Sequence, residues 1–235
     1  MPPRIEVSRS GFPLCDDPKT GKFTGSKLVR SPVLVSPDGR FRAYSENEAV
    51  AFEAAVGGNN ACVNTARLFV AGPDNGDFRL ADVKAPQYPD ALIKGLFLVD
   101  WSPDSRYLLS SVMAGTYGSD FAAWEAESFD AWYGISSPDG FPYQAIRHRF
   151  RPGCGSDAHA LGFSKDGQIV LRIGPDYDEE GVVRRGSCVT KPGLWSLNSK
   201  ELDRPQQALN ALPDTYKVQQ FGSWLEAPAT PGPPR

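Results

Sequence analysis

Carboxylates gather in two short stretches of this 235-residue chain, and they are the first residues to consider for chemistry. The run DYDEEG at 176–181 offers oxygen ligands to Ca²⁺. It lacks the alternating spacing and the distal glutamate of an EF-hand loop, so we predict no metal site there. Carboxylate pairs perform acid and base catalysis only where their environments separate the two pKa values. The candidates are Asp120, Glu125, Glu127, Asp176, Asp178 and Glu179.

Residues suited to nucleophilic or metal catalysis are sparse. Neither His148 nor His159 stands in a metal-binding spacing with another histidine, and the G-x-S-x-G elbow of hydrolases does not occur. Ser156, Asp157 and His159 are close in sequence, but triad members meet through the fold rather than through adjacency. We therefore expect a non-enzymatic protein without a cofactor. A hydrolase or glycan-active enzyme that uses the carboxylates above is the alternative.

Three aromatic residues and part of the acidic run are predicted to bind a ligand. The aromatic residues fall in a segment expected to be a loop, where rings can stack on a sugar or anchor a peptide. Burial of the rings under neighbouring loops is the other interpretation. The predicted binding residues are Tyr117, Phe121, Trp124, Asp176, Tyr177 and Asp178.

A repeated turn indicates the scaffold that must position these residues. SPDGRFRAYSE, SPDSRYLLSS and SKDGQIVLRI each contain a turn aspartate, with 66 residues from Asp38 to Asp104 and 62 from Asp104 to Asp166. Strand-like runs flank each turn, which predicts three hairpins. Glycine follows the aspartate and accepts a positive φ in the first and third copies, whereas Ser105 replaces it in the second.

A second turn recurs inside each unit. Asp74, Asp139 and Asn198 lie 36, 35 and 32 residues after the first turn aspartate of their units. Each unit therefore holds four strands. We predict an all-β fold, a β-propeller-like array of about three four-stranded antiparallel blades.

From Lys27 to Leu202 the chain resembles the WD40-like repeats of the TolB type, in which a Ser-Pro-Asp-Gly turn joins the first two strands of a blade. The resemblance implies a propeller fold and a binding or scaffolding role. In the prolyl peptidase relatives a propeller gates a separate hydrolase domain, which we do not expect in this chain. Because units of 62 to 66 residues exceed the usual blade of about 40 to 45, an unrelated β-sandwich is the alternative fold.

We expect the surplus residues to form one long loop per unit, between the second and third strands, at 54–65, 114–128 and 175–192. In a propeller these loops would share one face. Long connections on a rigid scaffold often carry function. That face is the predicted surface for a protein or glycan partner.

Three blades leave open sheet edges that invite pairing with other strands. RIEV near the N-terminus and YKVQQF at 216–221 could close the array by adding a blade. Alternatively, two chains could join as a six-bladed ring, or the chain could be a piece of a larger assembly. A homo-oligomer therefore stays among the expected partners.

The four cysteines predict two disulfides. Cys15 and Cys62 occupy positions in the first unit that match those of Cys154 and Cys188 in the third, and a shared face could bring each pair within disulfide distance. Four reduced thiols in a cytosolic protein are the alternative. The disulfides Cys15–Cys62 and Cys154–Cys188 would place the protein in the periplasm or outside the cell.

Charge and hydropathy argue against two kinds of partner. The net charge is -3 and no run of Lys or Arg exceeds two residues, so we expect no nucleic acid. No stretch approaches the about 18 apolar residues of a membrane helix, and MPPRIEVSRS lacks the apolar centre of a secretory signal, so we expect no membrane insertion. The predicted organisation is a single β domain at 1–226 and a Pro-rich disordered tail at 227–235.

Overall fold

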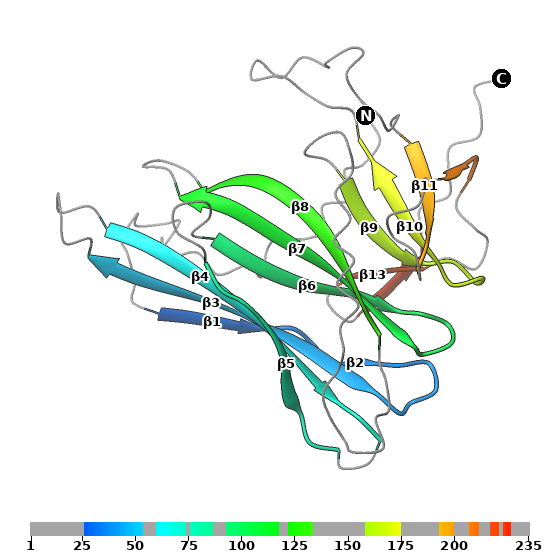
Figure 1. The fold of residues 1–235 in the computed structure, drawn as a ribbon, viewed down its shortest axis with the longest axis horizontal. Coiled ribbons are helices and arrows are strands. Elements are labelled where there is room, and N and C mark those ends of the chain that lie inside the picture. The colour runs from blue at the N-terminus through cyan, green and yellow to red at the C-terminus, as the bar shows by residue number, and fades with distance from the viewer. Residues whose placement is uncertain are drawn as a thin grey trace.

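The fold is that of a computed structural model, which describes residues 26–53, 60–73, 76–86, 93–117, 122–133, 158–174, 193–199, 207–211, 217–220 and 223–226 (Figure 1). Within these ranges every regular element is a β-strand, which confirms the all-β class. No helix in them has the length and apolar character needed to span a membrane. The strands pair in antiparallel sheets.

The first unit of the repeat forms the first sheet. Its order is β1-β3-β4-β5, and β2 also pairs with β3. Strands β1 and β2 pair with successive stretches of β3, so together they act as one strand interrupted at 31–33. The strands are β1 (Ser26–Arg30), β2 (Leu34–Val35), β3 (Arg42–Glu53), β4 (Asn60–Ala71) and β5 (Arg79–Lys84).

The second and third units form sheets of the same kind, with orders β6-β7-β8 and β12-β11-β10-β9. In both sheets each strand pairs with the next one along the chain. The strands are β6 (Ile93–Trp101), β7 (Tyr107–Tyr117), β8 (Ala122–Tyr133), β9 (Ala158–Phe163), β10 (Gln168–Ile173), β11 (Gly193–Asn198) and β12 (Gln207–Leu209). Four strands are confirmed in the first and third units, and the turn predicted at Asp139 lies outside the described residues.

The long loops predicted in the first two units are wrong over much of their length. Residues 60–65 belong to β4, and residues 114–117 and 122–128 belong to β7 and β8. All of these residues except Glu125, at a register shift of β8, pair with a residue of the opposite strand, so the surplus chain lengthens two hairpins. The free ends of both hairpins point to the same side of the molecule (Figure 1). The predicted loop at 175–192 lies outside the described residues.

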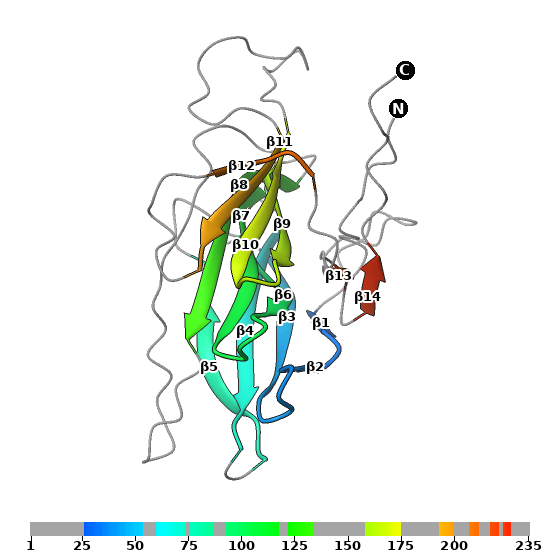
Figure 2. The ribbon, with the colours of Figure 1, turned by 90° about the vertical axis from the view of Figure 1, so that its right-hand side faces the viewer.

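The segment at 216–221, predicted to help close the array, forms part of a short local hairpin. Its residues Lys217–Gln220 form β13, which pairs with β14 (Ser223–Glu226) in a separate hairpin. Strand β13 contacts β6 and β9 and so packs beside the first strands of the second and third sheets (Figure 2). RIEV and the predicted tail at 227–235 lie outside the described residues.

The serine that opens the repeated turn holds its two strands together. The Ser36 hydroxyl donates to Asp38 Oδ1 (2.7 Å) and accepts from the N–H of buried Phe41 (2.9 Å). Ser102 makes both kinds of contact in the second turn. Burial disfavours the charge on Asp38, but hydrogen bonds from Ser36 and Arg40 outweigh it and hold the pKa of this carboxyl below its usual range. The Ser-x-Asp spacing therefore has a direct structural cause.

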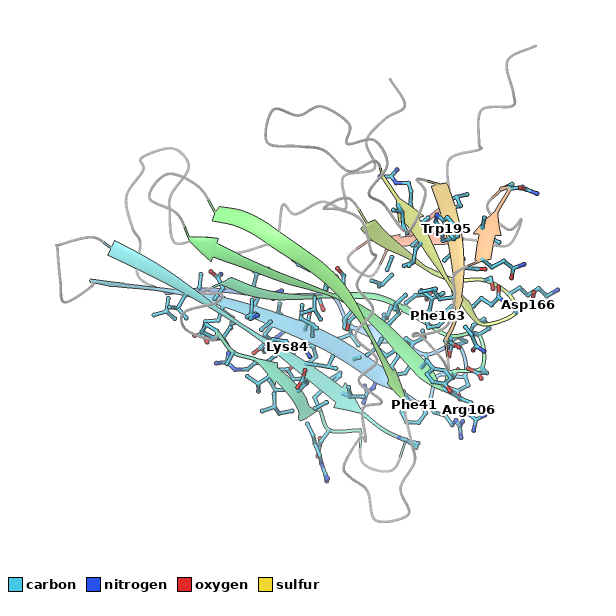
Figure 3. All side chains as sticks on the ribbon, turned by 45° about the horizontal axis from the view of Figure 1, so that its top comes forward. Phe41, Lys84, Arg106, Phe163, Asp166 and Trp195 are labelled. Carbon is cyan, nitrogen blue, oxygen red and sulfur yellow. The ribbon has the colours of Figure 1, made fainter. Side chains whose placement is uncertain are left out.

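Ser105 adopts a positive φ of 60°, as the glycines of the other two turns do. This conformation costs a residue with a Cβ atom about 1 kcal/mol. The Ser105 hydroxyl accepts a hydrogen bond from the Asp38 N–H (3.0 Å), which joins the second turn to the first. This bond offsets the strain and explains why a serine stands where the other copies have glycine. Figure 3 shows Phe41, Arg106 and Asp166, from the three turn regions, at one end of the sheets.

The second sheet is buried on both sides, between the first and the third. Toward the first sheet, one core cluster combines Leu34, Phe41, Ala43, Ala66, Leu68 and Val70 with Leu96, Trp101, Leu108 and Val112. Toward the third sheet, another combines Val99, Tyr107 and Leu109 with Ala160, Phe163, Ile169, Leu171, Ile173 and Leu197. Because side chains alternate along a strand, β6 and β7 supply both clusters at once.

Hydrogen bonds cross the interface of the first and second sheets. The Asn47 side chain accepts from the Leu96 N–H (2.9 Å) and donates to the Leu96 carbonyl (3.1 Å). The Trp101 indole N–H donates to the Leu34 carbonyl at 3.2 Å. These bonds satisfy buried polar groups and fix how the first sheet lies on the second.

We predict that Ser102→Ala lowers the free energy of unfolding by about 1 to 3 kcal/mol, because the buried Tyr107 N–H loses its side-chain partner. Urea unfolding measures the change. Lys165→Ala, at an exposed site in the third turn, is the control and should change stability by less than about 0.5 kcal/mol. Equal stabilities of the two variants would contradict the role of the serine.

A second prediction separates strain from hydrogen bonding at Ser105. Ser105→Ala loses the bond from Asp38 and keeps the strained φ, whereas Ser105→Gly loses the bond and relieves the strain. We expect the alanine variant to be less stable than the glycine variant by about 1 kcal/mol. Thermal or urea unfolding of the pair measures this difference. If the alanine variant were the more stable one, the positive φ would carry no cost.

Candidate binding surface

The structure places two of the predicted binding residues on the long β7–β8 hairpin. Tyr117 is the last residue of β7 and pairs with Ala122, and Trp124 of β8 pairs with Gly115. Both therefore sit near the hairpin end rather than in an irregular loop. The other predicted binding residues lie outside the described residues: Phe121, Asp176, Tyr177 and Asp178.

Most residues of the other predicted sites also lie outside the described residues. Cys62 is on β4, opposite Ala51, while Cys15, Cys154 and Cys188 are not described, so both disulfides stay predictions. Among the carboxylates of the enzyme alternative, Glu125 and Glu127 are on β8. His159 is on β9, opposite Arg172, whereas Ser156 and Asp157 lie outside the described residues. Within the described part of the chain, no three side chains of His, Cys, Asp or Glu gather as a metal site.

A surface that the sequence did not single out is the side of the first sheet that faces away from the second. We call it the outer face. The register of the strands assigns to it Leu28, Arg30, Val35, Arg42, Tyr44, Glu46, Glu48, Val50, Arg67, Phe69, Leu80 and Val83. Five of its aliphatic side chains are between 40% and 53% exposed, namely Leu28, Val35, Val50, Leu80 and Val83.

Aromatic rings and arginines pack on one another at the centre of the outer face. Tyr44 stacks on Phe69 with ring centroids 4.8 Å apart, and Phe78 meets the Tyr44 ring edge-on at 4.8 Å. The Arg30 guanidinium lies 4.7 Å from the Tyr44 ring centroid, and that of Arg42 lies 5.3 Å from Phe78. These contacts hold flat side chains in fixed positions on a rigid sheet.

Two ion pairs cross neighbouring strands of the outer face. Arg30 contacts the Glu46 carboxylate at 2.6 Å, and Arg67 contacts that of Glu48 at 2.8 Å. Such partly exposed pairs stabilise the fold by less than about 1 kcal/mol each. They place both signs of charge beside exposed aliphatic side chains on this face.

No family model, curated protein or solved structure matches the chain. The resemblance to the WD40-like repeats of the TolB type therefore stays a prediction. Function has to be argued from the surfaces and the buried groups that the structure describes.

Asp100 is a buried carboxyl at the interface of the second and third sheets, where the β6–β7 register shifts. Its Oδ2 accepts from the Phe163 N–H (3.2 Å), and its Oδ1 has no hydrogen-bond partner among the described residues. Burial raises the pKa of Asp100 to about 8, although hydrogen bonds from the Phe163 and Trp101 N–H groups act in the opposite direction. The carboxyl is therefore mostly protonated at neutral pH. The signal in the sequence was an acidic residue inside the apolar strand LFLVDW.

Stability should depend on pH through Asp100. Between about pH 4 and pH 8 the folded chain holds this proton and the unfolded chain releases it, so the contribution of Asp100 to stability falls as pH rises. Asp100→Asn mimics the neutral acid and removes this dependence. Relative to wild type, the variant should gain on the order of 4 kcal/mol between pH 4 and pH 8.

Urea unfolding at several pH values measures this gain. Asp166→Asn, at an exposed position of the third turn, is the matched control and should follow the wild-type profile. A stability difference between Asp100→Asn and wild type that stayed constant with pH would show that Asp100 ionises normally in the folded chain.

Proposed function

We propose that the chain is a non-enzymatic binding or scaffolding protein, built as a propeller-like array, that binds another protein through the outer face of its first sheet. The observation that carries this proposal is the group of five exposed aliphatic side chains on one rigid sheet face. Four of the five lie along the two edges of the sheet with charged side chains between them, and a surface that mixes exposed apolar and polar side chains in this way is typical of protein interfaces. A flat face of this kind suits a protein surface better than a small molecule, which prefers a concave site.

The side chains around this patch are of the kinds that dominate protein interfaces. Tyrosine, phenylalanine and arginine are enriched at interface centres, and here Phe69 and Arg30 lie against the ring of Tyr44, which is only 8% exposed and supports them. Because these rings are already stacked, little side-chain entropy is lost on binding. The outer face is therefore prepared for association before a partner arrives.

The propeller is supported by the way consecutive sheets stack. Each sheet is a meander, and each packs a face on the next sheet in chain order, as neighbouring blades do. The resemblance of the turns to WD40-like repeats supports the same arrangement. The predicted disulfides, and the periplasmic or extracellular location that they imply, belong to this proposal. The mass of the native particle with and without reductant tests the cysteine pairing and the assembly.

The end of the β7–β8 hairpin is a second proposed binding surface, for a peptide or glycan. Tyr117 and Trp124 lie on paired strands there, and the hairpin keeps its pairing from Tyr107 to Tyr117. The pairing holds the backbone of these residues in fixed positions relative to one another, which an irregular loop does not.

Photo-crosslinking tests the main proposal. Leu80, which is 50% exposed on β5, is replaced by p-benzoylphenylalanine in the full chain, and the cells are irradiated. The control carries the same residue in place of exposed Ala208 on β12 of the third sheet. We expect a covalent protein adduct from position 80 and none from position 208. No adduct from position 80, with the chain folded, would refute binding through the outer face.

A further inference from the structure

The repeat shows what the outer face corresponds to in the other two sheets. The residue before the turn serine is Trp101 in the second unit and Phe163 in the third, and these are 3% and 6% exposed because each packs against the preceding sheet. The same position in the first unit is Val35, which is 51% exposed. Val35 on the outer face therefore occupies the position through which the second and third sheets each contact the preceding sheet.

The strand after the turn shows the same correspondence. Leu108 of β7 and Ile169 of β10 are buried against the preceding sheet, and Arg42 holds their place on β3. Four residues further along each strand, and on the same face, Val112 of β7 corresponds to Glu46 of β3. The outer face thus has the backbone geometry of a sheet interface, but it carries charged side chains at positions where the other sheets have apolar ones.

We propose that the outer face is the interface of a homodimer, in which it packs against the same face of a second copy of this chain. This inference rests on the proposed protein-binding function and names the partner. The two central strands of the first sheet have 12 residues each, and β1, β2 and β5 have 5, 2 and 6; at about 3.3 Å per residue and about 4.8 Å per strand they cover on the order of 600 Å². A stable interface buries about 800 Å² of each partner, so the face is near the size that a dimer needs.

The side of the third sheet that faces away from the second favours pairing of two outer faces. The other arrangement, called head-to-tail, would pack the outer face of one copy on this side of the third sheet in the next copy. A head-to-tail ring would need that side to be free to receive the outer face of the next copy. Leu161 and Val170 on that side are 3% and 0% exposed and pack with Leu194 and Leu209 within the chain. A face that pairs with itself about a twofold axis requires no second free surface.

The charges of the outer face also suit self-association. It carries Arg30, Arg42 and Arg67 together with Glu46 and Glu48, so neither sign dominates strongly. Glu46 is paired with Arg30 and Glu48 with Arg67 within the sheet, so two copies can approach without strong repulsion, and the apolar side chains at both edges of the sheet can meet across a twofold axis. A face with one sign of charge would repel its own copy.

Sedimentation velocity on the full chain tests the dimer. Wild type is compared with Leu80→Lys/Val83→Lys and with Val35→Lys, which alter opposite edges of the outer face, and with Ala208→Lys as the control. We expect wild type and the control at twice the 25.6 kDa of one chain. The outer-face variants should dissociate with a roughly 100-fold weaker constant, because each buries unpaired ammonium groups. Their circular dichroism and unfolding midpoints should match the control.

Other results would overturn the inference. A monomer at all concentrations excludes the dimer, a dimer that survives the outer-face substitutions places the interface elsewhere, and assembly beyond two copies indicates head-to-tail contacts. The adduct from position 80 separates the two levels of the proposal. An adduct of one chain with a second copy supports both, an adduct with a different protein retains protein binding and rejects the dimer, and no adduct rejects both.

Discussion

The structure depends on the burial of the second sheet on both of its faces. Strands β6 and β7 alternate their side chains so that Leu108 packs on the first sheet while Leu109 packs on the third. A strand buried on both sides has no solvent face, which is why LFLVDW and YLLSSV are almost continuously apolar. The first and third sheets are placed by this middle sheet. The outer face is the side of the first sheet that the stack leaves uncovered, and Asp100 lies at an interface that the stack creates.

Much of this architecture could be predicted from the sequence because turn chemistry is local. The serine, aspartate and glycine of the repeated turn make contacts within six residues of one another, so their spacing alone indicated the hairpins. The order of strands followed from the second turn of each unit. Strand length could not be predicted in the same way. Residues 60–65, with the sequence NACVNT, have no marked strand preference, and their pairing with β3 decides their conformation.

The outer face was missed for a related reason. In FRAYSENEAV the side chains that face the second sheet are small or polar, such as Ala43, Ser45 and Asn47, while the larger Tyr44 lies on the opposite side. The alternation does mark the side with Arg42, Glu46 and Glu48 as the solvent side, but it does not show that exposed aliphatic side chains of other strands gather there. Small residues are needed on the inner face because the first two sheets approach closely there, and the Asn47 amide bonds directly to the backbone of Leu96. Asp100 was overlooked because its environment depends on Phe163 of β9, 63 residues later in the chain.

The bond between Asn47 and Leu96 also bears on how the chain is made. During synthesis the first sheet can complete all its strand pairs before residue 93 leaves the ribosome, because none of them involves a later strand. Its inner face, with Leu68 and Val70, is then exposed to solvent until β6 emerges and the Asn47 amide can bond to the backbone of Leu96. The nascent protein therefore passes through a stage in which the inner face of the completed first sheet exposes apolar side chains that will later be buried. The rate of translation of the next unit determines how long this stage lasts.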